Sequence, residues 1–329
     1  TTDAPATHAA DKHPTRYTHL VAMHEGAGSS KAPLFIVAGM FGNVLNLRHL
    51  AHLVGHDRPC YGLQARGLYG DHEPHLTFEE AAADYIRELR TVQPHGPYYL
   101  AGFSGGGLHA YEMAHQLIRD GEQVAFLGML DTPLPRSELL TKLDKVKMHV
   151  QRIGRERHRY FWNLVFGRLT WEWQQLRRRF GTAEAPAPQT QFHSETIEAA
   201  FRAACEVYQP PQFDGKLYLF RPKLSPTHIF GPDRMINLDR RFIYHGNGWS
   251  RHVCEVSVTE VPGDHDSMVL EPNVRVLGAR LRKAIDQAEA LQAAHSAPAR
   301  KKRPIDVTLA RSAAERVEAM QDEVVEVRS

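Results

Sequence analysis

The sequence has little of what several protein classes require. Cysteine occurs only three times in 329 residues, at Cys60, Cys205 and Cys254, and none of the spacings is that of a metal or redox motif. We expect these thiols to be reduced, as is usual in a cytoplasmic protein. No stretch approaches the roughly 20 apolar residues that a membrane-spanning helix needs. The composition thus predicts neither a disulfide scaffold nor a membrane span.

An excess of charge is also missing. Lys and Arg number 40 and Asp and Glu 38, for a net charge of +2, which gives no global attraction for nucleic acid. Residues 1–16 lack the apolar segment of a signal peptide and are rich in Ala, Thr, His and Pro. This composition predicts a flexible linker between domains, although a processed terminus would have the same pattern.

Apolar runs alternate with helical patterns from residue 17 onward. Such alternation is typical of an α/β protein, with a mostly parallel sheet and helices on both faces. The expected strands are Thr18–Met23, Leu34–Ala38, Pro59–Gly62, Tyr98–Ala101, Val124–Leu130, Lys216–Phe220 and Val253–Val261. The expected helices are Val44–Val54, Phe78–Val92, Leu108–Asp120, Ser194–Tyr208 and one from Pro272 to about Gln292.

The alternation is interrupted after the fifth expected strand. Residues 137–180 have a helical pattern, with an apolar stripe on one face and arginines on the other. Inserted between strands, this block is typical of a lid over an active site. Leu309–Val327 is a charged amphipathic segment, which is either a solvated tail or a docking helix. The sequence therefore predicts a linker (1–16), a first core segment (17–136), a helical lid (137–212), a second core segment (213–293) and a basic linker with a charged tail (294–329).

The segment Gly102-Phe103-Ser104-Gly105-Gly106 is the strongest chemical signal. It follows an apolar run and precedes a helical one, which is the strand–turn–helix context of a G-x-S-x-G nucleophile elbow. Such a turn exposes one hydroxyl in a strained conformation, and its glycines let the strand and helix approach closely. The alternative is an ordinary glycine-rich turn. The context favours an enzyme with Ser104 as its nucleophile.

A serine needs a base to accept its proton and an acid to orient that base. In enzymes with this elbow the chain order is Ser, acid, His. His265 lies between the last expected strand and the last helix, where the base belongs; the alternative is a solvent-facing loop histidine. Asp131 ends the strand after the elbow helix and is the expected acid. Asp233 is the alternative, because no carboxylate directly follows Lys216–Phe220.

The negative oxygen of a tetrahedral intermediate requires backbone N–H donors. The expected donors are the amide of Gly105, directly after the nucleophile, and that of Met40, in the loop Ala38-Gly39-Met40-Phe41-Gly42-Asn43. The same loop could be a simple turn.

With these residues, the sequence resembles the type I thioesterase domains of non-ribosomal peptide synthetases and polyketide synthases, which have the α/β-hydrolase fold. The resemblance covers about residues 17–290 and is strongest in Gly42-Asn43-Val44, Tyr61 to Gly67, Gln93 to Met113, Leu130-Asp131-Thr132 and Pro262 to His265. The chain has Ala38-Gly39-Met40-Phe41-Gly42 where the family commonly has His-Pro-x-Gly-Gly. The bulk of Met40 and Phe41 alters the expected pocket beside the oxyanion.

The resemblance implies a serine enzyme that takes an acyl chain from the phosphopantetheine arm of a carrier protein and needs no cofactor of its own. The carrier domain is expected upstream in the same polypeptide. Two alternatives are a carrier-independent esterase or acyltransferase and a catalytically silent docking module. The expected substrate-binding residues are Phe41, Phe103, Phe161, Trp162 and Phe166; packing of the lid aromatics on the core is the alternative.

Overall fold

The computed structural model describes residues 19–28, 30–70, 72–135, 142–144, 146–148, 150–151, 194–224, 227–229, 234–237 and 243–296. The chain divides into two units, Thr1–Ala288 and Glu289–Ser329. The first unit contains the sheets and the candidate site. Of the second, only the continuation of the last helix to Ser296 is described.

A seven-stranded sheet forms the centre of the first unit, in the order β1-β3-β2-β4-β5-β6-β10. All neighbours pair in parallel except β1, which is antiparallel to β3. The strands are β1 (Leu20–His24), β2 (Leu34–Val37), β3 (Cys60–Leu63), β4 (Tyr98–Phe103), β5 (Val124–Leu130), β6 (Phe213–Pro222) and β10 (Val253–Val261). The mostly parallel sheet predicted from the sequence is confirmed.

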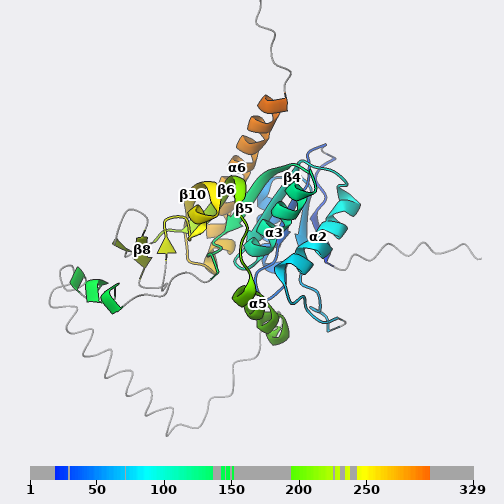
Figure 1. Cartoon of the computed structure of the whole chain (residues 1–329). Coiled ribbons are helices and arrows are strands. Elements are labelled where there is room, and N and C mark those ends of the chain that lie inside the picture. Colours follow the sequence, from blue (N-terminus) through cyan, green and yellow to red (C-terminus); the bar gives the residue numbers. More distant parts are fainter. Residues whose placement is uncertain are drawn as a thin grey trace, which may run out of the picture. The chain divides into compact units, whose positions relative to one another are not determined.

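Helices cover both faces of this sheet (Figure 1). They are α1 (Arg48–Val54), α2 (Phe78–Val92), α3 (Gly106–Arg119), α5 (Glu195–Val207) and α6 (Asn273–Ser296), with short 3-10 turns at Leu45–Leu47, Trp249–Arg251 and Ser267–Val269. Residues on α2, α3 and α5 share one hydrophobic core, whereas residues on α1 and α6 share the other.

The two cores follow from the alternation of side chains along each strand. In β2, Phe35 belongs to the core with α2 and α3, whereas Leu34 and Ile36 belong to the core with α1 and α6. Every residue of β2 and β4 is buried. Strands buried on both faces read as continuous apolar runs, which is why these two were recognisable in the sequence.

A second sheet lies between β6 and β10 in the chain and was not predicted. It consists of β7 (Thr227–Ile229), β8 (Arg234–Asn237) and β9 (Ile243–Tyr244), all antiparallel. These strands have two to four residues, too few for a period-two pattern to stand out.

The helix boundaries reflect local signals. Thr77 begins α2, with its Oγ1 accepting a hydrogen bond from the Glu80 N–H at 3.2 Å, and Glu79 and Glu80 lie in the first turn. A cap oxygen and acidic residues at that end satisfy free N–H groups and complement the helix dipole. Ser194 accepts from the Ile197 N–H at the start of α5 in the same way. None of the described helices is long and apolar enough to cross a membrane.

His109 of α3 packs against the core that α2, α3 and α5 share. Its ring is 4.8 Å from that of Phe78, 5.7 Å from that of Tyr85 and 6.0 Å from that of Phe201, measured between centroids. Nδ1 is buried and has no hydrogen-bond partner within the described part of the chain. Burial lowers the pKa of His109 from 6.5 to about 4.

This lowered pKa predicts acid sensitivity. The unfolded state takes up a proton near pH 6.5 and the folded state only near pH 4, so the contribution of neutral His109 to stability is complete above pH 6.5 and is lost as the pH falls to 4. We expect a loss of at most about 3 kcal/mol. Urea unfolding between pH 7 and pH 4 gives the free energy of unfolding of the unmutated protein and of His109→Leu as a function of pH. This free energy should fall more steeply toward pH 4 in the unmutated protein, and equal slopes would contradict the prediction.

Candidate active site

Ser104 occupies a sharp turn between β4 and α3. It has a positive φ of 51°, which is uncommon for a residue with a side chain. A Cβ on Gly102 would lie 2.2 Å from the carbonyl oxygen of Gly106, and one on Gly106 would lie 2.3 Å from that of Ala38. Glycine is therefore required at both positions. The predicted strand–turn–helix context of Ser104 is confirmed.

Ser104, His265 and Asp131 form a chain of hydrogen bonds. The Nε2 of His265 lies 2.9 Å from the Oγ of Ser104, and its Nδ1 lies 2.8 Å from the Oδ2 of Asp131. Because an ionised carboxylate only accepts, Nδ1 carries the proton and Nε2 is left to accept that of Ser104. This arrangement can activate a hydroxyl as a nucleophile.

The environments of the two partners differ. The side chain of Asp131 is fully buried, whereas that of His265 is 34% exposed. The His265 ring stacks on Phe103, with centroids 5.3 Å apart and planes 23° apart. Burial holds the acid in a fixed place, while the base keeps one side open to an incoming substrate.

Asp131 is fixed at the end of β5 by its backbone. Its φ is 53°, and its N–H donates to the carbonyl oxygen of Phe220 in β6 at 2.7 Å. The next residue, Thr132, donates its hydroxyl to the carbonyl oxygen of Ser104 at 2.7 Å. These hydrogen bonds join the ends of β4, β5 and β6 at Ser104 and Asp131.

Asn247 also supports Asp131. Its Nδ2 lies 3.4 Å from the Oδ1 of Asp131 and 3.3 Å from the carbonyl oxygen of Thr132, and the Trp249 indole donates to the same carbonyl at 3.0 Å. Sequence reasoning missed Asn247. Its only signal in the sequence was the turn dipeptide Asn247-Gly248. In the structure both residues have positive φ.

The two expected oxyanion donors are backbone groups beside Ser104. Met40 lies in the loop after β2, and Gly105 directly precedes α3. Neither N–H has a hydrogen-bond acceptor within the described ranges. Both are therefore available to an oxygen that enters the site.

A cavity of about 620 Å³ adjoins Ser104. Its volume is in the usual range for a small-molecule site. Phe41 and Phe103, both expected to bind substrate, lie in its wall. The complete lining is Gly39, Met40, Phe41, Asn43, Leu45, Asn46, Phe103, Ser104, His265 and Asp266. Phe161, Trp162 and Phe166, the other expected substrate-binding residues, and Asp233, the alternative acid, lie outside the described residues.

Helix α5 packs on the elbow and on the loop after β2. A Cβ on Gly105 would lie 2.3 Å from the ring of Phe201, and one on Gly42 would lie 3.3 Å from the Cγ2 of Ile197. Sequence reasoning predicted α5 but did not identify Phe201 or Ile197, because nothing local shows which face of the helix meets Gly105. The only grouping of potential metal ligands among the described residues is His19, His75 and Asp84, which contains none of these residues.

Comparison with known proteins agrees with the fold. The family model described as "Thioesterase domain" matches residues 32–326. The chain is 28% identical over 291 residues to the non-reducing polyketide synthase ntnG of Nectria sp, covering 83% of this chain and 13% of the synthase. It is 48% identical over 101 residues to the dimodular nonribosomal peptide synthase of Bacillus subtilis (strain 168), covering 31% and 4%.

Solved structures give the same picture. The crystal structure of the NocB thioesterase domain from the nocardicin cluster matches with a TM-score of 0.56 at 20% identity, covering 82% of this chain and 99% of that domain. At this identity the likeness establishes a shared α/β-hydrolase fold. The chain thus spans a small part of the synthases that it matches and nearly the whole of a thioesterase domain.

The contacts of Asn247 predict that it positions Asp131. In Asn247→Ala the carboxylate loses a charge-assisted hydrogen bond, and we expect turnover of a chromogenic ester to fall roughly 10-fold. Asn247→Asp places a second carboxylate beside Asp131, so the acidic limb of the pH–rate profile should move to higher pH. Both effects are measured as kcat/KM against pH.

Gln93→Ala is the matched control. The Gln93 amide donates to the carbonyl oxygens of His95 and Pro97 and lies next to α2, away from the cavity lining. It should lower thermal stability without changing the pH–rate profile. An unchanged profile in Asn247→Asp would show that Asn247 does not act through Asp131.

Proposed function

Since this chain belongs to the thioesterase domain family, we propose that it releases an acyl, polyketide or peptidyl chain from the phosphopantetheine thioester of a carrier protein. The carrying observation is the hydrogen-bonded series Ser104–His265–Asp131 at the edge of a 620 Å³ cavity. Ser104 is the nucleophile, His265 the general base and acid, and Asp131 the residue that orients His265.

In the first half of the reaction, the Oγ of Ser104 attacks the thioester carbonyl carbon while the Nε2 of His265 takes its proton. The negative oxygen of the tetrahedral intermediate accepts hydrogen bonds from the N–H groups of Met40 and Gly105. Collapse of the intermediate breaks the carbon–sulfur bond, and His265 returns the proton to the departing pantetheine thiol. The chain is then an ester of Ser104.

In the second half, water or a hydroxyl or amine of the bound chain attacks this ester, again with His265 as base. The bond between the acyl carbon and the Oγ of Ser104 then breaks, and His265 returns the proton to that Oγ. Water gives a free acid, and an internal nucleophile gives a ring. Phe41 and Phe103 supply apolar wall to the bound chain beside the reacting carbon. Phe161, Trp162 and Phe166 extend that wall from the lid in this proposal.

The proposed partner is a carrier domain, upstream in the same polypeptide. Support comes from the relatives, which are synthases of which the matched segment is 13% or 4% of the length. The reaction itself uses only side chains and backbone groups of this chain and calls for no cofactor. The location proposed for such a synthase is cytoplasmic, where protein thiols are usually reduced.

The acyl-enzyme predicts the behaviour of a Ser104→Ala variant. Incubation with acyl-pantetheine thioesters should add the mass of one acyl group to the intact protein, and Ser104→Ala should show no such gain. Turnover should fall by roughly 10⁴- to 10⁶-fold in this variant. Intact mass spectrometry and product analysis measure both.

Ser250→Ala removes an exposed serine of the Trp249–Arg251 turn and is the control. It should label and turn over like the unmutated protein. An adduct that persists in Ser104→Ala would assign the nucleophile elsewhere.

The carrier predicts a preference among substrates. The same acyl group should be released faster from a carrier protein than from a simple aryl ester, because docking of the carrier contributes binding energy that the small ester lacks. The measurement is the ratio of kcat/KM values for the two substrates. Equal values would favour a carrier-independent esterase of the same fold, while Ser104→Ala would still be inactive.

A further inference from the structure

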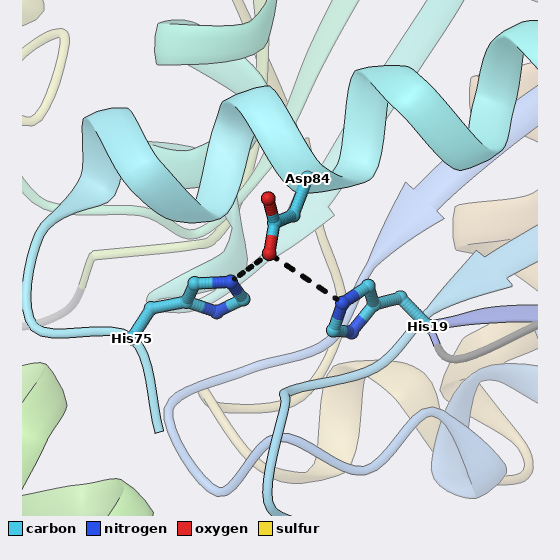
Figure 2. Close-up of side chains that lie close together, drawn as sticks. All are labelled: His19, His75 and Asp84. Atoms are coloured by element: carbon cyan, nitrogen blue, oxygen red, sulfur yellow. Dashed lines mark hydrogen bonds and ion pairs between the residues drawn. The ribbon is translucent and has the colours of Figure 1, made fainter. Parts of the chain in front are cut away.

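Two histidines and one aspartate form a group outside the lining of the active-site cavity, although one of them, His75, lines a neighbouring pocket together with Gly39 and Met40. His19 directly precedes β1, His75 lies in the loop before α2, and Asp84 lies within α2. Figure 2 shows the two imidazole rings on either side of the Asp84 carboxylate. We propose that these three residues bind a divalent transition-metal ion of the zinc type, which fastens β1 and the His75 loop to α2.

The donor atoms come close to the geometry of such a site. The Nε2 of His75 lies 2.8 Å from the Oδ2 of Asp84, and the Nε2 of His19 lies 4.0 Å from the same oxygen. All three donor atoms lie within 4.8 Å of one another. Bonds of about 2.1 Å in tetrahedral geometry place donors about 3.4 Å apart. The His75–Asp84 distance is shorter than this value and the His19–Asp84 distance is longer, so small side-chain rotations suffice to bring the donors to this spacing.

The donor types select the metal. Two imidazole nitrogens and one carboxylate oxygen suit Zn²⁺, Co²⁺ or Fe²⁺ better than Ca²⁺ or Mg²⁺, which prefer oxygen alone. A neutral imidazole has a lone pair on one ring nitrogen, which it can give to such a metal.

The rings of His19 and His75 are buried and lie close together, with centroids 5.4 Å apart. The side chains of His19 and His75 are 4% and 6% exposed, and the Nδ1 of His19 is buried without a hydrogen-bond partner in the described part of the chain. Tyr85 packs against both rings, with centroid distances of 5.3 Å and 6.0 Å.

A route for the ion and for a fourth ligand is present. His19 and Asp84 line a cavity of about 450 Å³ together with Arg66, His72, Arg87, Glu88 and Thr91. Water from this cavity can complete a tetrahedral shell, as it does in sites with three protein ligands.

Two arginines contact the same carboxylate and compete with a metal. The guanidinium of Arg66 lies 3.3 Å from the Oδ2 of Asp84, and that of Arg87 contacts Oδ1. Arg87 is 71% exposed, so it can turn toward solvent, and Arg66 also donates to the carbonyl oxygen of Glu73. When the metal binds, the proton that His75 donates to Asp84 moves from Nε2 to Nδ1 of the same ring, and the carboxylate accepts the metal in its place.

The test is zinc content of the full chain without substrate, which makes it independent of the proposed function. The protein is stripped with EDTA and dialysed against zinc held at low micromolar concentration by a chelator buffer. The unmutated chain should retain one zinc ion more than His75→Gln, Asp84→Asn or His19→Asn. With Co²⁺ instead, it should show the visible absorption of a tetrahedral site, and these variants should not.

His52→Gln is the control, because His52 belongs to a separate group in which its ring lies 5.2 Å from that of His24. It should keep the ion. Saturating zinc should raise the Tm of the unmutated protein and of this control by roughly 5 °C, and leave the Tm of His75→Gln unchanged.

One of the three ligand variants is chosen because it should disturb folding least. His19→Asn removes a side chain whose Nε2 lies 4.0 Å from Asp84, beyond hydrogen-bond distance, so the loss of folding expected from it is the smallest. Equal zinc content in all five proteins, or none in the unmutated chain, would overturn the proposal and leave the three residues as a hydrogen-bonded cluster.

Discussion

The candidate site depends on two residues that hold a left-handed backbone conformation at neighbouring strand ends. Ser104 follows β4 with a φ of 51°, and Asp131 follows β5 with a φ of 53°. Each conformation costs free energy and persists only because the surroundings fix it. The Ser104 N–H donates to the carbonyl oxygen of Leu130, and the Thr132 hydroxyl donates to that of Ser104. The two turns thus hold each other, and His265 forms hydrogen bonds with the side chains of both residues.

The sequence predicted the parts of this arrangement that have local signals. The buried runs of β2 and β4 identify themselves, because a strand covered on both faces is apolar throughout. Ser104 was identified by its neighbours in the chain, and His265 by its place between the last strand and the last helix. The structure brings both Ser104 and Asp131 within hydrogen-bond distance of His265.

What the sequence did not predict depends on contacts between distant segments. Asn247 meets Asp131 across 116 residues, and no periodicity encodes that meeting. The strands β7 to β9 were missed because they are too short for a pattern to show. Nothing in the sequence distinguished His19 and His75 from the other histidines, of which there are 20 in all. Only the fold places both beside the same carboxylate on α2.

The contact between Phe201 and Gly105 has a consequence for exchanging parts between related domains. The lid predicted from the sequence lies in the segment between β5 and β6, so an exchange of the lid between related domains needs a junction near α5. The last helix of that segment, α5, fills the space that a side chain on Gly105 would need, so that helix belongs with the elbow and not with the exchanged piece. A chimera joined before Glu195 keeps both α5 and Gly105 from the same protein. One joined at Phe213 replaces α5 but not Gly105, so the contact between Phe201 and Gly105 is lost.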